Sequence, residues 1–363
     1  MLRKVRELSI AHHCGNRPVL IWGIGACAHT IYRDLVREGG LECLGFYDNN
    51  PNGKEYCYGH KILSREELLK LDKTTPVVVA TLKHPTLQDV STELSSLGFE
   101  NVFTVMNWFK FCSKVDIEKC RNIFKSAEMD IQKVYNLLAD EKSKYVYEKV
   151  VEYRLTNDSK IFYDIRQLGY KQYFPVGEIF EPDENEVFID AGCLNAATIK
   201  DLKDWTNDSY KKVYAFEPSS LDKIIVDENI EFFGYRAESV EAGLFSHNGE
   251  ISFDVANCGA SKISDEGDST IKVVTLDTFM EGKDDKVTFI KMDIEGAEMD
   301  ALAGAEQIIC RDHPKLAISI YHKITDLWEI PLWIHEKCPG YKFYVRHHSV
   351  VNGETVLYAR YDG

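Results

Sequence analysis

Two segments in the second half of the chain place groups able to do acid–base chemistry at the ends of apolar runs. The run in FIKMDIEGAE ends at Asp293, and the run in KLAISIYH ends at His322. Such runs predict parallel strands, whose C-terminal ends meet at the rim where α/β sheets bind ligands. An imidazole accepts protons near neutral pH. We therefore predict that His322 is a catalytic base and that Asp293 faces the reacting groups; the alternative for a lone histidine is an ordinary surface or core residue.

Two further carboxylates follow Asp293 in the same segment. Glu295 and Glu298 are three residues apart, which puts them on one face of the first turn of a helix. The helix macrodipole favours carboxylates at that position. We interpret both as N-terminal helix charges.

A second group of motifs has the spacing of a nucleotide-type cofactor site. In EVFIDAGCLNAAT a predicted strand ends at Asp190 and Gly192, and a helix begins near Ala196. Backbone N–H groups and the helix N-terminus of such a turn can receive an anion, and a glycine allows close approach. We assign Asn195 to the same cofactor-binding turn. A strand that ends in D-x-G can also be a plain turn.

The next predicted strand, KVYAFEP, ends in Glu217. Its offset from Asp190 is close to the roughly 20 residues at which an acid meets ribose hydroxyls in nucleotide-binding α/β folds. Two consecutive strands that each end in an acid favour a site over two turns. We predict that Asp190, Gly192, Asn195, Glu217 and Asp293 bind a cofactor. The loop with Asn257, Gly259 and Ser261 either folds over this site or is an ordinary loop.

The elements that would position these residues form a second α/β set from about Glu186. The predicted strands are EVFIDAG, KVYAFEP, VEAGLFS, VTFIKMD and KLAISIYH, with helices from about Ala196, Ser220, Gly296 and Leu327. KFYVRHHS and ETVLYAR close the chain as a hairpin. A mostly parallel sheet that ends in an antiparallel pair has the outline of a class I methyltransferase fold, whereas a dehydrogenase sheet is expected to end on a sixth parallel strand.

An earlier stretch, from Arg17 to about Val105, also alternates strand and helix patterns. It contains G-x-G-x-x-A at Gly23, Gly25 and Ala28. This smaller Rossmann-like unit is too short for a complete dinucleotide site, so we favour a vestigial or sugar-nucleotide-type module over an NAD enzyme. Residues 106–178 have a helical, aromatic-rich pattern and are interpreted as a helical connector.

The amino-acid composition indicates which kinds of binding partner and cellular location to expect. The 363 residues carry 43 Lys+Arg against 58 Asp+Glu, a net charge of −15, which disfavours nucleic acid. No apolar run is long enough for a membrane span, and we expect a cytoplasmic protein. The ten cysteines contain no C-x-x-C pair and are interpreted as reduced core thiols, such as Cys27 and Cys310. The eleven histidines are dispersed, so no metal site is predicted.

Together these motifs resemble the FkbM family of S-adenosylmethionine-dependent methyltransferases. The resemblance lies in VFIDAGCLNAATI, VYAFEPSS, VVTLDTF, FIKMDIEGAEMDALAGA and YKFYVRHHS…ETVLYA, over roughly residues 172–360. It implies S-adenosylmethionine as cofactor and O-methyl transfer to a sugar or polyketide-type small molecule. The family usually has a second glycine where this chain has Ala196, and often an acidic or amide pair at Leu194 and Asn195.

We therefore expect an α/β protein with three parts: a Rossmann-like domain at 1–105, a helical connector at 106–178 and a class I methyltransferase domain at 179–363. The predicted function is methyl transfer to a hydroxyl of a small molecule such as a sugar or nucleotide sugar. Two alternatives remain open, an NAD-dependent sugar-modifying enzyme that uses the Gly23 turn and a non-catalytic binding protein of the same fold.

Overall fold

The computed structural model describes residues 17–38, 40–81, 86–104, 117–156, 161–175, 177, 179–254, 262–263, 269–350 and 352–363. The predicted loop with Asn257, Gly259 and Ser261 lies outside these ranges. Two compact units divide the chain: Met1–Ser126 with Lys149–Asp164 and Val350–Asn352, and Ala127–Glu148 with Ile165–Ser349 and Gly353–Gly363. Within the described ranges, no helix combines the length and the apolar character that crossing a membrane needs.

The first unit contains a parallel sheet in the order β2-β1-β5-β6. Its central strands are short apolar runs buried along their whole length, as expected for strands covered on both faces. This confirms the predicted separate Rossmann-like sheet. The elements are β1 (Val19–Trp22), α2 (Ala26–Ile31), the π-helical η2 (Tyr32–Glu38), β2 (Cys43–Tyr47), β3 (Tyr56–Cys57), β4 (His60–Lys61), α3 (Arg65–Lys70), β5 (Val77–Val79), α4 (Thr86–Ser96) and β6 (Val102–Thr104).

The turn after β1 is held by the chain itself. Gly23 has φ +115°, and a Cβ there would lie 3.0 Å from the Ala80 carbonyl oxygen. The Asp48 carboxylate accepts a hydrogen bond from the Ile24 N–H (3.1 Å). The acid that follows β2 thus supports the glycine turn directly.

The segment between the two sheets is mostly helical in its described part, although residues 166–175 form no helix. It contains α5 (Ile117–Ser126), α6 (Glu128–Leu137), α7 (Glu141–Thr156) and α8 (Ile161–Ile165). The division of the chain at residues 105 and 178 stays a prediction.

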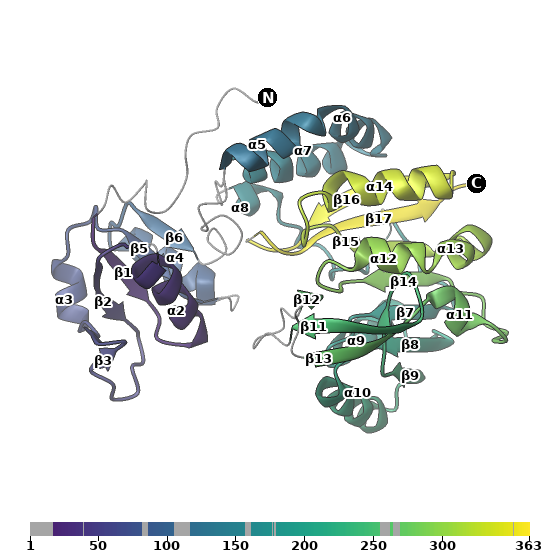
Figure 1. Cartoon of the computed structure of the whole chain (residues 1–363), viewed down its shortest axis with the longest axis horizontal. Coiled ribbons are helices and arrows are strands. Elements are labelled where there is room, and N and C mark those ends of the chain that lie inside the picture. Colours follow the sequence, from purple (N-terminus) through teal and green to yellow (C-terminus); the bar gives the residue numbers. More distant parts are fainter. Residues whose placement is uncertain are drawn as a thin grey trace. The chain divides into compact units, whose positions relative to one another are not determined.

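The second unit is built on a seven-stranded sheet in the order β16-β17-β15-β14-β7-β8-β9 (Figure 1). Neighbouring strands from β15 to β9 are parallel, while β17 pairs antiparallel with both β15 and β16. This is the predicted methyltransferase-type sheet with its antiparallel terminal hairpin. Its elements are β7 (Val187–Ala191), α9 (Ala197–Trp205), β8 (Lys212–Phe216), α10 (Ser220–Phe233), β9 (Ala237–Val240), α11 (Leu276–Met280), β14 (Phe289–Met292), α12 (Glu298–Ala303), α13 (Glu306–Asp312), β15 (Lys315–Ser319), α14 (Asp326–Lys337), β16 (Tyr341–His347) and β17 (Thr355–Tyr361).

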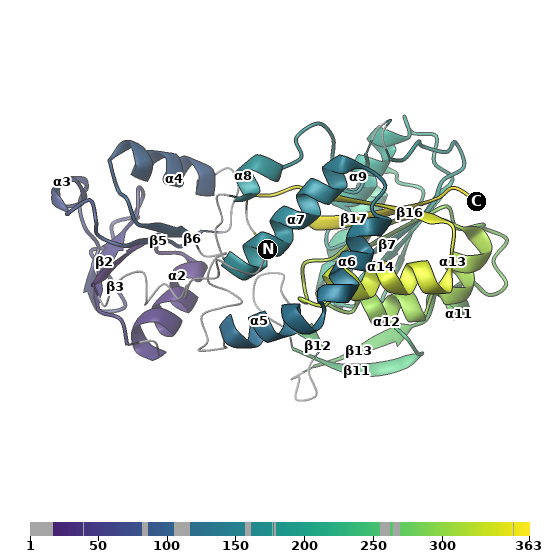
Figure 2. The same cartoon turned by 90° about the horizontal axis from the view of Figure 1, so that it is seen from above.

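Helices cover this sheet because its strands alternate apolar side chains toward both faces. Phe188 on β7 and Val213 on β8 share a core cluster with Ile199 and Leu202 of α9 and Val226 of α10. Elsewhere in the unit, α14 packs between α6 and α12, as Figures 1 and 2 both show. The packing fixes the loops that leave the C-terminal ends of the parallel strands.

The third predicted strand is displaced. We expected it in VEAGLFS, but the strand of the main sheet is β9, which ends at Val240. The chain then bends at residues 241–242 and enters a separate four-stranded sheet, in the order β10-β13-β11-β12. That sheet consists of β10 (Gly243–Leu244), β11 (Gly249–Asp254), β12 (Lys262–Ile263) and β13 (Ser269–Val274).

The cysteine prediction is wrong for one pair. Cys310 and Cys338 form a disulfide between the end of α13 and the residue after α14, with their Cα atoms 5.3 Å apart. Their separation of 28 residues matches no short motif, so the sequence pattern gave no sign of the bond. Among the cysteines whose side chains the structure describes, Cys27, Cys43, Cys57 and Cys193 are reduced, as predicted.

Candidate active site

The turn after β7 lies directly against the loop that follows β14. Gly192 has φ +78°, and a Cβ at this position would lie 2.0 Å from the Asp293 carbonyl oxygen. Only glycine fits at this contact. Leu194 (φ 52°) and Ala196 (φ 62°) also adopt the left-handed conformation. Ala196 is therefore in a backbone conformation that glycine adopts with less strain than alanine.

Asn195 sits at the exposed tip of this turn. Its side-chain oxygen accepts a hydrogen bond from the Ala197 N–H (3.1 Å), and its carbonyl accepts one from the Asn229 side chain (2.9 Å). The predicted cofactor residue thus holds the start of α9, where the backbone N–H groups of a helix point outward.

Glu217 follows β8 and turns toward the same loop. Its two carboxylate oxygens accept hydrogen bonds from the Leu194 N–H (3.2 Å) and the Ser219 N–H (3.0 Å). Only 7% of the residue is exposed. Burial raises the pKa of this carboxyl to about 7 despite the two backbone donors. Glu217 is thus beside the turn, as predicted.

A buried lysine joins the two halves of the site. Lys291, the third residue of β14, donates hydrogen bonds to the carbonyls of Ala191 (3.1 Å) and Gly192 (2.7 Å). Its Nζ also lies 3.1 Å from Asp190 Oδ1, and both side chains are almost completely buried. Burial lowers the pKa of Lys291, but the charges of Asp190 and Asp293 outweigh it and leave the pKa raised. Asp190 therefore supports the turn through Lys291 and is itself completely buried.

Asp293 is held by two phenols. Tyr173 donates to Oδ2 (2.8 Å) and Tyr321 donates to Oδ1 (2.9 Å). Burial raises the pKa of Asp293, but Lys291, His322 and these two hydrogen bonds outweigh it, so the pKa is lowered. The carboxylate remains ionised in the centre of the site.

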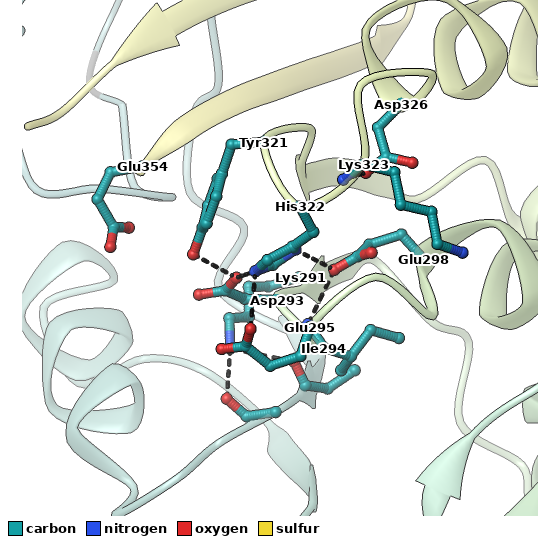
Figure 3. Close-up of polar contacts among 12 residues, drawn as sticks. Lys291, Asp293, Ile294, Glu295, Glu298, Tyr321, His322, Lys323, Asp326 and Glu354 are labelled. Carbon is teal, nitrogen blue, oxygen red and sulfur yellow. Dashed lines mark hydrogen bonds and ion pairs between the residues drawn. The ribbon is translucent and has the colours of Figure 1, made fainter. Parts of the chain in front are cut away.

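His322 lies next to Asp293, as the two strand ends predicted. Figure 3 shows its ring between Glu298 on one side and Asp293 on the other. Nε2 is 3.5 Å from Asp293 Oδ1 and 3.5 Å from Glu295 Oε2, while Nδ1 is 2.8 Å from Glu298 Oε1. Burial lowers the pKa of His322, but the interaction with Glu298 and the neighbouring charges dominate and raise it. The structure brings together the predicted base and the predicted acid.

Glu354, just before β17, adds another carboxyl group to this region (Figure 3). It accepts a hydrogen bond from the Gln172 side chain. Burial, with a contribution from the charge of Asp293, raises the pKa of Glu354 to about 7. The surroundings of His322 are strongly acidic, which suits a positively charged ligand.

Asp293, Glu298 and His322 each bring a donor atom within 4.8 Å of the other two, a grouping that a metal ion would require. The acids, however, lie on opposite ring nitrogens of His322. An imidazole nitrogen offers its lone pair in one direction only. The two carboxylates therefore contact the two nitrogens of one imidazole and do not converge on a shared point.

Sequence reasoning missed four residues of this site. Lys291 had a detectable signal, because it is a charged residue inside an otherwise apolar strand. Tyr321 directly precedes His322, and Glu298 was seen but interpreted as a helix charge. Tyr173 precedes the sheet in sequence and had no signal, because its partner is 120 residues away.

Comparisons with known proteins agree with the fold. Residues 163–343 match the model of the methyltransferase FkbM domain. A crystal structure of methyltransferase FkbM from Methylobacillus flagellatus superimposes with a TM-score of 0.77 over 96% of this chain and 92% of that chain, at 21% identity. At this identity the match shows the shared fold.

A curated relative covers less of the chain. The hexuronic acid methyltransferase AglP from Haloferax volcanii is 35% identical over 96 residues, which are 25% of this chain and 40% of the relative. The chain thus matches less than half the length of that protein. The matched domain and the shared fold show that the chain belongs to the FkbM family of S-adenosylmethionine-dependent methyltransferases.

Proposed function

We propose that the protein methylates a hydroxyl group of a sugar or another small molecule, and that His322 removes the hydroxyl proton. One observation carries the proposal: His322 and Asp293 follow neighbouring parallel strands and lie 3.5 Å apart at the rim of the sheet. S-adenosylmethionine supplies an electrophilic methyl group on a positively charged sulfonium.

The residues present fit this cofactor. Glu217 offers carboxylate oxygens suited to the hydroxyls of a ribose, beside a turn where Gly192 allows close approach. Asn195 holds the start of α9 through the Ala197 N–H, and Asp190 supports the turn after β7 through Lys291. The ionised Asp293 provides negative charge where a cation would bind.

The chain's role in the transfer is to align an alcohol and to remove its proton. When bound, S-adenosylmethionine would supply the methyl group to the alcohol oxygen and would leave as S-adenosylhomocysteine, which keeps the electron pair of the broken carbon–sulfur bond. The hydroxyl proton passes to His322 Nε2. The resulting imidazolium is stabilised by Asp293 and Glu298 on its two sides.

Cofactor binding is tested by calorimetric titration with S-adenosylhomocysteine and, separately, with NAD. We expect S-adenosylhomocysteine to bind and NAD not to bind. Glu217→Ala should weaken S-adenosylhomocysteine at least about tenfold, because charge-assisted hydrogen bonds contribute roughly 1.5 to 3 kcal/mol. Tight binding of NAD alone would favour the dehydrogenase alternative.

Methyl transfer is tested with isotope-labelled S-adenosylmethionine and a panel of hexoses, hexuronic acids and nucleotide sugars. AglP supports including uronic acids, and the acidic surroundings of His322 favour uncharged sugars. His322→Ala should reduce turnover by roughly 10²- to 10⁴-fold and leave S-adenosylhomocysteine affinity unchanged. His335→Ala, at an exposed position of α14, is the matched control. Near-normal turnover in His322→Ala would assign proton removal to another group.

A further inference from the structure

We propose that Glu298 is a positioning residue for His322: it fixes Nδ1 of the imidazole so that Nε2 faces Asp293 and the reacting hydroxyl. The effect on turnover rests on the proposed methyl transfer. The pairing of the two side chains is a property of the protein itself and can be measured without any substrate.

The carboxylate of Glu298 is itself fixed in place. The residue is fully buried at the first position of α12, and its Oε1 accepts a hydrogen bond from the Ile294 N–H (3.0 Å). Glu295, with φ 57°, turns the chain between these two residues. The same Oε1 atom lies 2.8 Å from His322 Nδ1. Backbone geometry thus decides where the imidazole is held.

A neutral imidazole carries its hydrogen on one nitrogen and a lone pair on the other. Because a carboxylate oxygen lies 2.8 Å from Nδ1, the position of Glu298 favours the tautomer with hydrogen on that nitrogen. The lone pair is then on Nε2, the nitrogen that faces Asp293 and Glu295. Those two carboxylates repel a lone pair and attract the N–H formed after proton transfer, so the arrangement favours uptake of the proton.

A helix-dipole charge does not account for Glu298. Such charges stabilise a helix while remaining at the surface, whereas this carboxylate is fully buried against a histidine. The same helix has an ordinary acid at Asp300, which is only partly buried and accepts a hydrogen bond from the Ser246 hydroxyl (3.2 Å). Asp300→Asn is therefore a matched control for the loss of one carboxylate from α12.

Charged and titratable groups face His322 from each element around it. Their combined effect raises the pKa of His322 against its burial. The removal of Glu298 changes one contribution among several, so the variant must be compared with a control at constant ionic strength. The groups are Asp293, Glu295 and Glu298 in the loop after β14 and the start of α12, Tyr321 and Lys323 on either side of the histidine in sequence, Asp326 at the start of α14, and Glu354 before β17.

The first experiment titrates the full-length protein with isotope-labelled histidine by NMR, without ligand. We expect the pKa of His322 to fall by about one unit or more in Glu298→Gln and to stay at the wild-type value in Asp300→Asn. An unchanged pKa in Glu298→Gln would overturn the pairing.

The second experiment measures turnover against pH in the same three proteins. Glu298→Gln should lower kcat at least about tenfold and move the midpoint to lower pH, with the KM for S-adenosylmethionine within about twofold of wild type. Glu298→Ala should lose more, because it removes the acceptor oxygen as well as the charge. Equal losses in Glu298→Gln and Asp300→Asn would overturn the positioning role, since they would reflect only the stability of α12.

The two experiments separate two kinds of failure. A protein that binds no S-adenosylhomocysteine would contradict the proposed function, while a shifted His322 pKa would still support the pairing. A protein that methylates its acceptor normally in Glu298→Gln would contradict the positioning role alone.

Discussion

Glu217, the residue proposed to bind the ribose, lowers the stability of the ligand-free protein. The residue is buried at the end of β8, and its two hydrogen bonds from backbone N–H groups do not offset its desolvation. A carboxyl whose pKa is raised to about 7 keeps its proton in the native state at pH values where the unfolded chain has released it. Burial of this acid therefore works against folding as the pH rises.

We predict that Glu217→Gln gains stability relative to wild type as the pH is raised. Between pH 4.5 and 7.5 the free energy of unfolding of Glu217→Gln should increase relative to that of wild type by as much as about 3 kcal/mol. The reason is that residue 217 titrates only in the wild type. Urea unfolding at the two pH values measures this change. Glu231→Gln, at an exposed position of α10, is the control. Parallel pH dependence in wild type and Glu217→Gln would contradict the raised pKa.

At the scale of elements, the contact between the turn after β7 and the loop after β14 decides whether the site can assemble. Gly192 and Gly234 both have positive φ, 78° and 61°. A Cβ at Gly192 would overlap the Asp293 carbonyl, whereas a Cβ at Gly234 would have no atom within 4 Å. Substitutions at these two glycines therefore distinguish the stability lost to a positive φ from the stability lost to steric overlap.

Gly234→Ala should lose about 1 to 2 kcal/mol of stability, the usual cost of the left-handed conformation. Gly192→Ala should lose at least about 3 kcal/mol and also S-adenosylhomocysteine binding, because the turn must move away from Asp293. Urea unfolding and calorimetry measure the two effects. If Gly192→Ala bound the ligand as tightly as Gly234→Ala, the close contact would not be needed for the site.

The elements of the main sheet could be predicted because buried parallel strands are continuous apolar runs, as in β7, β8, β14 and β15. The third strand was misplaced, since Ala237–Val240 is polar and only partly buried at the sheet edge and lacks such a run. Neighbouring strand ends predicted that Asp293 and His322 lie close together, as they do. The role of Glu298 depends on a local turn at Glu295, which no periodicity reveals.

For the molecule as a whole, every residue assigned to the methyltransferase site belongs to one of the two compact units. In the other unit, the turn at residues 23–28 has its acid, Asp48, already bound to the backbone of Ile24. Because the match to the family covers residues 163–343, most of which belong to the second unit, we expect the cofactor to bind there. The disulfide between Cys310 and Cys338 also lies within the second unit. Because disulfides persist in oxidising compartments, the cytoplasmic location stays a prediction.

We predict that S-adenosylhomocysteine slows hydrogen exchange of the full-length protein at residues 190–196 and 217–219 and leaves residues 23–28 unchanged. Ligand binding suppresses the local opening that exposes backbone amides. Mass spectrometry of peptic fragments with and without ligand measures it, and Glu217→Ala at the same ligand concentration is the control. Protection of residues 23–28 by NAD, without protection at 190–196, would favour the dehydrogenase alternative.

Tyr173 has a practical consequence for anyone who recombines or shortens proteins of this kind. Its phenol holds Asp293, although it precedes the first strand of the methyltransferase sheet, and its backbone N–H is bound by the Tyr358 hydroxyl (3.2 Å). A fragment cut at residue 179 would keep every strand of that sheet and lose one of the two phenols on its central carboxylate. Grafts and chimaeras should therefore begin upstream of this tyrosine, near residue 163, where the match to the family also begins.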